Sequence, residues 1–303
     1  MTIHVRRNVD GVLLLDKPCG MTSNAALQAV KRLYLATKAG HTGTLDPLAT
    51  GLLPIAFGEA TKFAHMLLDA DKRYLAVLRL GVETTTGDAE GEPIRGCAVE
   101  VAQSDLDVAL AAFRGEIRQQ PPMYSALKHH GRPLYVLARQ GIEVERSERR
   151  VTVHELAMVS READRITLDI RCSKGTYIRS LAADIGRRLG CGAHLAALRR
   201  TEIGSFRVDE SVALADLERM SADALTSRLR PIDLFVLSLP RADLGSNEAV
   251  RFLQGQPVPR PPGLVAPRWR VYGEESFLGI GATRPDGALW PQRLINRGQV
   301  YTL

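Results

Sequence analysis

The 303-residue sequence has few cysteines, few aromatic residues and no long apolar segment. Its four cysteines are far apart and form no CxxC pair, which argues against a disulfide framework or a zinc site: Cys19, Cys97, Cys172 and Cys191. The absence of a run of 18 apolar residues argues against a membrane span. Near the start, residues 11–15 form the only apolar run before Asp16, too short for a signal peptide. We therefore expect a cytoplasmic protein.

Lysine is also scarce, because only seven of the 40 basic residues are lysines and none follows Lys174. The net charge of +6 is compatible with a polyanionic partner. Basic residues gather in two stretches. Residues 187–200 hold four arginines and no acid, and residues 114–132 hold four basic residues, two histidines and one acid. Each stretch is either a solvated basic surface or a contact for an anion.

Hydrophobic patterning predicts a chain that mixes strands with helices. We expect strands at residues 11–18, 73–81 and 165–172. We expect helices at residues 22–36, with Thr22 or Ser23 as N-cap, at 59–72, at 104–115, capped by Ser104 and stopped by Gly115, and in 173–190, ended by Gly190.

Two regions have a different character. Residues 116–150 combine prolines, paired histidines and mixed charges, which indicates a long excursion from the core. From about residue 240 we expect a short helix at 246–255, a proline-rich break at 257–263 and two strands joined across Asp286 and Gly287. This pattern predicts a small, mostly β module of roughly 60 residues at the C-terminal end.

The stretch "GHTGTLDPLATG", residues 40–51, holds one acid, Asp46, among glycines, threonines and a proline. Such an acid is either a turn residue or a carboxylate held for chemistry. The first is the usual case, whereas the group of polar residues nearby supports the second: His41, Thr42, Thr44, Thr50 and Lys62. Separately, "KGTYIR" places Lys174, Tyr177 and Arg179 where a strand turns into a helix. An arginine facing the acid would keep it ionised.

Several other chemistries do not fit the sequence. "GHTGT" lacks the lysine and serine that end a phosphate-binding loop. His41 and Asp46 have no further clustered ligands and make a poor metal site. A serine triad lacks its nucleophile elbow.

Five segments occur in a fixed order: "KPCGMTS" at 17–23, "GHTGTLDPLATGLLPIAFGEATKF" at 40–63, "DKRY" at 71–74, "RCSKGTYIRSLAADIG" at 171–186 and "GAHLAALRR" at 192–200. Together they closely resemble the bacterial tRNA pseudouridine-55 synthases, the TruB family. The resemblance covers residues 9 to about 235, and residues beyond match the family's PUA-like RNA-binding domain only weakly.

The resemblance implies an α+β pseudouridine synthase fold, with a central, mostly antiparallel sheet flanked by helices. It implies a catalytic domain at residues 1–238, with the RNA-contacting excursion at about 116–150, and a PUA-like module at 239–303. The implied reaction converts uridine 55 in the T-loop of tRNA to pseudouridine after base flipping, without a metal or organic cofactor. A monomer without an obligate protein partner is expected.

The resemblance also implies roles for particular residues. Asp46 matches the essential aspartate, Arg179 the arginine that pairs with it, and Tyr74 the tyrosine that stacks on the base and assists proton removal. His41 matches the histidine that helps extrude the nucleotide. Lys62 matches a lysine that supports the pocket, and Tyr177 and Leu198 match its walls. Whether Asp46 attacks the base or the sugar carbon stays open.

The basic stretches then become candidates for tRNA phosphate contacts, which fix register and carry little sequence information. The candidates are Arg114, Lys128, Arg132, Arg187, Arg188, Arg199 and Arg200. Two alternatives stay open: a guide-RNA-dependent synthase acting on ribosomal RNA, and a non-catalytic tRNA-binding or tRNA-folding protein. Activity on bare tRNA separates the first alternative, and the presence of Asp46, Tyr74 and Arg179 argues against the second.

Overall fold

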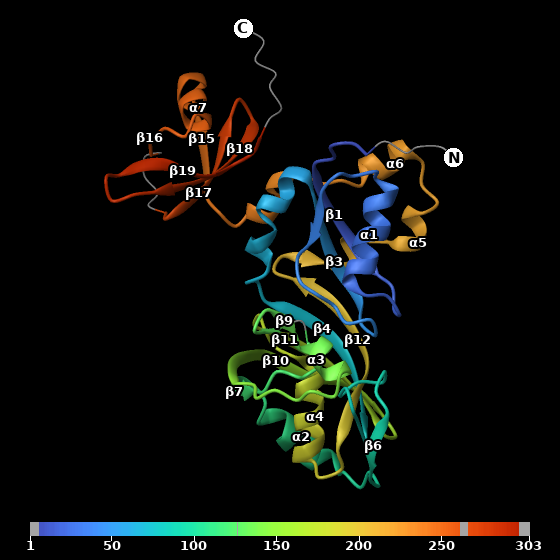
Figure 1. Cartoon of the computed structure of the whole chain (residues 1–303). Coiled ribbons are helices and arrows are strands. Elements are labelled where there is room, and N and C mark those ends of the chain that lie inside the picture. Colours follow the sequence, from blue (N-terminus) through green and yellow to red (C-terminus); the bar gives the residue numbers. More distant parts are fainter. Residues whose placement is uncertain (1–5, 126, 261–265, 297–303) are drawn as a thin grey trace.

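A computed structural model describes residues 6–125, 127–260 and 266–296. Two β-sheets organise these residues (Figure 1). The larger sheet has ten strands, whose main path runs β14-β1-β3-β12-β4-β11-β10-β7, with β2 beside β3 and β13 beside β12. Its pairs are antiparallel except β1 with β14 and β3 with β12. The expected α+β fold with a mostly antiparallel sheet is confirmed.

The strands of this sheet are β1 (Gly11–Lys17), β2 (Ala39–His41), β3 (Thr50–Phe57), β4 (Lys72–Leu80), β7 (Gly115–Gln119), β10 (Arg149–Glu162), β11 (Arg165–Cys172), β12 (Ala193–Ile203), β13 (Phe206–Arg207) and β14 (Val212–Ala213). Two short hairpins lie outside it, β5 (Val82–Thr84) with β6 (Pro93–Gly96) and β8 (Lys128–His129) with β9 (Arg132–Pro133). Among the described residues, the α-helices before residue 240 are α1 (Ser23–Leu33), α2 (Gln103–Ala111), α3 (Leu134–Arg139), α4 (Ile178–Arg188), α5 (Leu214–Leu217) and α6 (Ala222–Ser227).

Side-chain alternation along β1 separates two hydrophobic clusters, one on each face of the sheet. Leu13 and Leu15 join the cluster that α1 and α4 cover. Val12 and Leu14 join a second cluster with Phe63 of the segment after β3. A buried side chain of this kind stabilises the fold by about 2 kcal/mol. The sheet is thus buried on both faces where β1 and β3 lie.

The smaller sheet lies at one end of the molecule, where Figure 1 draws it in orange and red. It contains β15 (Arg241–Leu244), β16 (Val258–Pro259), β17 (Arg268–Gly273), β18 (Ser276–Thr283) and β19 (Ala288–Leu294), in the order β15-β17-β18-β19-β16, with α7 (Ser246–Leu253) packed against it. Phe277 of β18 packs edge-on against Phe63, with ring centroids 5.3 Å apart. The C-terminal β module therefore shares the second cluster with the large sheet.

The hairpin expected at Asp286 and Gly287 is present. Gly287 has a φ of +78°, which glycine adopts without strain. The Asp286 carboxylate accepts a hydrogen bond from the Ala288 amide at 2.9 Å. Part of the predicted proline-rich break at 257–263 lies outside the described residues.

Three local predictions are wrong. Residues 59–72 form two 3₁₀ helices, η1 (Gly58–Lys62) and η2 (Ala64–Leu67), in place of one α-helix, and β4 begins at Lys72. The break at Phe63 lets both Phe63 and Leu67 enter the same apolar cluster. The N-cap of α2 is Ala102 and not Ser104. Gly115 begins β7 and does not stop the helix, which ends earlier.

The excursion at 116–150 is shorter than expected, because both of its ends are strands of the large sheet. Residues 115–119 pair in register with residues 149–153. Between them lie the hairpin of β8 and β9 and helix α3. Leu134 and Leu137 of α3 form a small apolar cluster with Met123. Two further 3₁₀ helices, η3 (Val208–Glu210) and η4 (Ile232–Val236), lie between β13 and β15.

Candidate active site

Asp46 lies in the loop between β2 and β3, and hydrogen bonds from three parts of the chain fix this loop. The Ser23 hydroxyl on α1 accepts from the Leu45 amide at 2.7 Å and donates to its carbonyl at 2.9 Å. Gly51 closes the loop with a φ of +100°, and a Cβ there would lie 2.3 Å from the carbonyl oxygen of Arg200. Only glycine permits this approach of two backbones.

Lys17, the first residue of the "KPCGMTS" segment, also supports this loop. It was not singled out from the sequence. Its side chain is fully buried, and its Nζ donates to the carbonyls of Pro18 at 2.8 Å, Met21 at 2.6 Å and Pro47 at 3.4 Å. Burial lowers the pKa of Lys17, while the Asp46 carboxylate opposes this shift. A lysine that ends a strand with a five-residue apolar run was the available signal.

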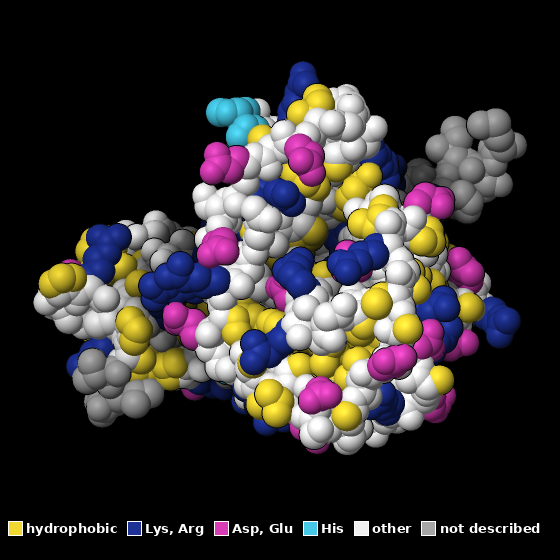
Figure 2. Space-filling view, turned by 90° about the horizontal axis from the view of Figure 1, so that it is seen from below, with side chains coloured by type: hydrophobic (Ala, Val, Ile, Leu, Met, Phe, Trp, Pro, Cys, Tyr) yellow, Lys and Arg dark blue, Asp and Glu magenta, His cyan; other side chains and the backbone are white. Residues whose placement is uncertain are grey.

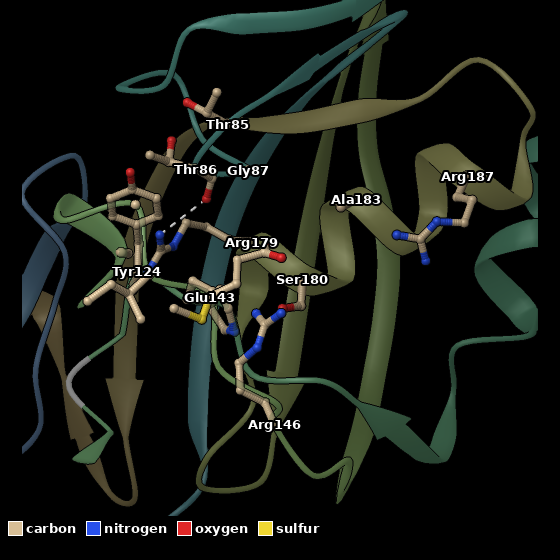
Figure 3. A pocket seen from close by; sticks show the side chains of 15 residues that line it. Thr85, Thr86, Gly87, Tyr124, Glu143, Arg146, Arg179, Ser180, Ala183 and Arg187 are labelled. Atoms are coloured by element: carbon tan, nitrogen blue, oxygen red, sulfur yellow. Dashed lines mark hydrogen bonds between the residues drawn. The ribbon is translucent and has the colours of Figure 1, made fainter. Parts of the chain in front are cut away.

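Arg179, in the first turn of α4, lies between two carboxylates. Its Nε contacts Asp46 Oδ2 at 3.0 Å and its Nη1 contacts Asp88 Oδ2 at 3.4 Å. Nη1 also donates to the Thr86 carbonyl at 3.3 Å, the contact drawn in Figure 3, and Nη2 donates to the Tyr124 carbonyl. The structure thus brings Asp46 and Arg179 together and adds Asp88, whose turn-rich surroundings gave no sign of a role.

The exposure of these three groups differs in a way that matters for chemistry. Arg179 and Asp88 keep only 7% and 3% of their side-chain surface exposed, whereas Asp46 keeps 40%. Burial raises the pKa of Asp46 above its ordinary value, Arg179 lowers it, and Asp88 raises it again. A carboxylate oriented by a buried cation and open on one side is suited to act on a bound molecule.

Tyr74 on β4 is buried and lies opposite Ile170 of β11 and Arg200 of β12 in the sheet. Burial raises the pKa of Tyr74, and hydrogen bonding and charge from Arg200 oppose the rise. Leu198, two residues before Arg200 on the same face of β12, is also buried. The expected wall at Leu198 and the expected ring at Tyr74 therefore share one face of the sheet.

Tyr177 and His41 are the remaining expected site residues near the Asp46 loop. Tyr177 precedes α4, and its backbone amide donates to Gln119 Oε1 at 3.0 Å. Burial raises the pKa of Tyr177 and lowers that of His41. The His41 Nδ1 and Thr42 Oγ1 atoms are buried and have no hydrogen-bond partner among the described residues. Two such adjacent atoms are unusual and leave hydrogen-bonding capacity for a ligand.

Lys62 makes its side-chain contacts away from the Asp46 loop, so its expected supporting role in the pocket stays a prediction. Its Nζ contacts Glu59 Oε2 at 2.7 Å and donates to the carbonyl of Leu294 in β19 at 2.9 Å. Glu59 Oε2 also accepts from the Asn296 amide at 2.5 Å. Lys62 and Glu59 therefore tie the end of β19 to η1.

Arg199 and Arg200 were expected to face solvent and contact phosphates. Arg200 is 1% exposed and donates to the carbonyls of Leu52 at 2.8 Å and Gly43 at 3.1 Å, so the expected phosphate contact is wrong. Arg199 points to the opposite face and forms a two-pronged contact with Asp16, at 2.6 and 3.1 Å.

The other basic candidates lie at the surface. Arg114, Lys128, Arg132, Arg187 and Arg188 are all exposed. Arg114 donates to the Leu156 carbonyl at 3.0 Å, and Arg187 contacts Asp184 at 2.8 Å within α4. On the face drawn in Figure 2, Lys and Arg side chains lie around the centre with acidic side chains between them. This face is mixed in charge and not uniformly basic.

Arg179 also lines a cavity of about 460 Å³ between α4 and the excursion (Figure 3). Tyr124, Glu143, Arg146 and Ser180 contribute to its wall, and Asp46 does not. Arg146 is fixed by the carbonyls of Val144 and Pro121, both at 3.1 Å. The segment between β7 and β10 thus packs beside the arginine that holds Asp46.

Within the ranges that the structure describes, no helix is long and apolar enough to cross a membrane. No group of three or more His, Cys, Asp or Glu side chains suited to a metal ion occurs there either.

Known proteins resemble this chain along nearly its whole length. A family model described as "TruB family pseudouridylate synthase (N terminal domain)" matches residues 31–178. Models of a "tRNA pseudouridylate synthase B C-terminal domain" and of "Pseudouridine synthase II TruB, C-terminal" match residues 179–237 and 240–295. Proteins named tRNA pseudouridine synthase B from Aromatoleum aromaticum and Dechloromonas aromatica are each 56% identical, covering 97% and 95% of this chain and 95% and 96% of theirs.

Solved structures agree with the fold. The chain superposes on a structure titled as a Cbf5-Nop10-Gar1 complex with a TM-score of 0.71 at 25% identity, covering 95% of this chain and 84% of that one. A structure of an H/ACA RNP bound to a substrate RNA gives 0.72 at 23% identity, over 95% and 85% of the two chains. Together with the family models and the close relatives, these findings show that the chain belongs to the TruB family of pseudouridylate synthases.

Proposed function

We propose that this protein isomerises uridine to pseudouridine in tRNA, at position 55 of the T-loop. The observation that supports this most directly is the half-open Asp46 carboxylate held by the buried Arg179, in a chain of this family. The N1–C1′ bond breaks and a C5–C1′ bond forms, the proton on C5 is lost, and N1 gains one. No atom is gained or lost overall, so an ionised acid and a proton acceptor suffice.

In this proposal Asp46 is the group that attacks, at either the base or the sugar carbon. Arg179 keeps it ionised against the effect of burial and orients it. Tyr74 stacks on the uracil and accepts the C5 proton, while Leu198 and Tyr177 form the walls. The base must leave the T-loop stack, which costs a few kcal/mol, and His41 with its free ring nitrogen helps to stabilise the flipped nucleotide.

We further propose that residues 1–238 form the catalytic domain and residues 239–303 a PUA-like RNA-binding module. The exposed cations on α4 and the β8–β9 hairpin would contact phosphates, and the excursion would order against tRNA. Such contacts make binding salt-dependent. The enzyme would act as a cytoplasmic monomer without an obligate protein partner.

The test uses purified protein, an unmodified tRNA transcript and no cofactor, with pseudouridine mapped by site-specific chemical labelling. Modification at the T-loop uridine, absent with Asp46→Asn, supports the proposal. Firm binding without modification would overturn it in favour of the guide-dependent or the non-catalytic alternative. Adding a guide RNA with partner proteins separates those two.

A further inference from the structure

Among the residues that the structure describes, no carboxylate pairs with the buried cation Arg200. The other buried arginine of the site, Arg179, contacts two carboxylates. Arg200 contacts none within 4.0 Å in the described part of the chain, and its fixed neighbours are the Leu52 and Gly43 carbonyls. Because an uncompensated buried charge is costly, such a residue is expected to have a further partner.

That partner is the phenol of Tyr74. The two residues lie directly opposite each other on β12 and β4, so their side chains leave the sheet on the same face, and both are buried. Tyr74 is 9% exposed, so water competes little with this contact. The other ionisable groups acting on Tyr74 are Cys172 on β11 and Asp46 on the loop, and both disfavour its ionised form.

Other cations lie nearby, but they bind elsewhere. Lys72, on the same strand, donates to the carbonyls of Leu68 and Ala70 at 2.8 and 2.6 Å. Lys17 donates only to carbonyls near the Asp46 loop. Burial, followed by the charge of Arg200, lowers the pKa of His41 and disfavours its cationic form. Arg200 is therefore the cation placed to stabilise a negative charge on the Tyr74 oxygen.

We infer that Arg200 is a positioning residue of the isomerisation, which holds the Tyr74 oxygen and stabilises its deprotonated form for accepting the C5 proton. This inference rests on the proposed function. Tyr74 first loses its proton to water. Once the C5–C1′ bond has formed, the phenolate takes the proton from C5 and becomes phenol again, while N1 takes a proton from water. The proton balance of the reaction is unchanged.

Arginine suits this task better than lysine because its planar fork can serve several acceptors at once. One side of the fork holds Gly43, three residues before Asp46, and another holds Leu52 on β3. The same guanidinium thus ties β12, at the position opposite Tyr74, to β3 and to the loop that carries Asp46. Lysine at this position would keep the charge but lose at least one carbonyl contact.

The first experiment measures the ionisation of residue 74 without relying on activity. A fluorinated tyrosine at position 74, whose phenol is more acidic, titrates in an accessible pH range and reports by ¹⁹F NMR. Arg200→Gln should raise its pKa by about one unit, a tenfold change in ionisation constant. Arg79, also on β4, is exposed and pairs with Asp164, so Arg79→Gln should leave the pKa of residue 74 unchanged. An unchanged titration in Arg200→Gln would overturn the inference.

The second experiment is a rescue. Arg200→Gln should slow single-turnover isomerisation by about 100-fold, and the fluorinated tyrosine should restore at least tenfold of this loss. The rate of Arg200→Lys should fall between those of the unsubstituted protein and Arg200→Gln. If Arg200→Gln does not fold, Arg200→Lys takes its place in the experiment. A slow variant without rescue would show that Arg200 only holds the fold. Absence of isomerisation in the unsubstituted protein would contradict the proposed function and not the NMR result.

Discussion

The two arginine pairs in residues 187–200 look alike in sequence and differ completely in the structure. Arg187 and Arg188 end α4 with exposed side chains. Arg199 and Arg200 lie in the middle of β12, where one pairs with Asp16 and the other is buried. A basic stretch therefore does not define a binding surface, because cations also build the interior around Asp46. Buried cations should control the chemical step, and exposed cations should control tRNA affinity.

Among the variants of the residues around the buried cations, Asp46→Asn should have the largest effect on the rate. It removes the charge that Arg179 orients, and turnover should fall on the order of 10,000-fold while tRNA affinity changes little. Single-turnover kinetics and filter binding measure the two quantities. Substantial residual turnover would remove Asp46 from the centre of the site.

Arg179→Met should cost about 100-fold in rate and shift the pH dependence. Arg179 lowers the pKa of Asp46, so its loss raises that pKa and moves the acidic limb of the rate profile to higher pH. Rates measured between pH 5 and 9 test this, with Arg179→Lys as the control that keeps a charge. An acidic limb at the wild-type position would contradict the electrostatic role.

Asp88→Asn should cost about tenfold and shift the limb in the opposite direction. Asp88 raises the pKa of Asp46, so its neutralisation lowers that pKa and extends activity to lower pH. The same pH series measures it. The exposed Glu90 provides the matched control as Glu90→Gln, whose weaker coupling should give a smaller shift. A shift to higher pH in Asp88→Asn would disprove this account.

Among the exposed cations, replacing Arg187 and Arg188 together by alanine should weaken tRNA binding by about tenfold. It should also reduce the slope of the logarithm of the binding constant against the logarithm of salt concentration by about two. The saturating rate should change less than the affinity does. Binding titrations from 50 to 200 mM salt decide this. A fall in saturating rate comparable with that of Arg179→Met would break the distinction between buried and exposed cations.

Lys62→Met should show the smallest effect, on stability. It removes the half-buried contacts of Lys62 to Leu294 and Glu59, at a cost of about 1 kcal/mol. Calorimetry should show a melting temperature lower by about 3 °C. A loss of turnover as large as that of Arg179→Met would return Lys62 to the pocket.

Sequence patterns predicted the elements whose signals are local. The strand at 11–17, the helix at 23–33 and the helix that ends before Gly190 follow from alternation and capping. The break in residues 59–72 depends on tertiary packing of Phe63, and propensity cannot show it. The strand character of residues 115–119 depends on a partner about 30 residues away.

The site shows the same limit. Family motifs pointed to Asp46 and Arg179, and the structure brings the two together. Lys17 and Asp88 were missed because their roles depend on long-range neighbours. Arg200 was placed at the surface because its acceptors, Leu52 and Gly43, precede it by 148 and 157 residues.

The alternation along β12 limits how this enzyme can change. Leu198 and Arg200 face the site, and Arg199 faces the other side. One inserted or deleted residue just before them would exchange the two faces, so that Arg199 entered the pocket and Arg200 left Tyr74. Residues 197–200 are therefore sensitive to a change of length, whereas an insertion in a connecting segment, such as the one between β7 and β10, leaves these two faces unchanged.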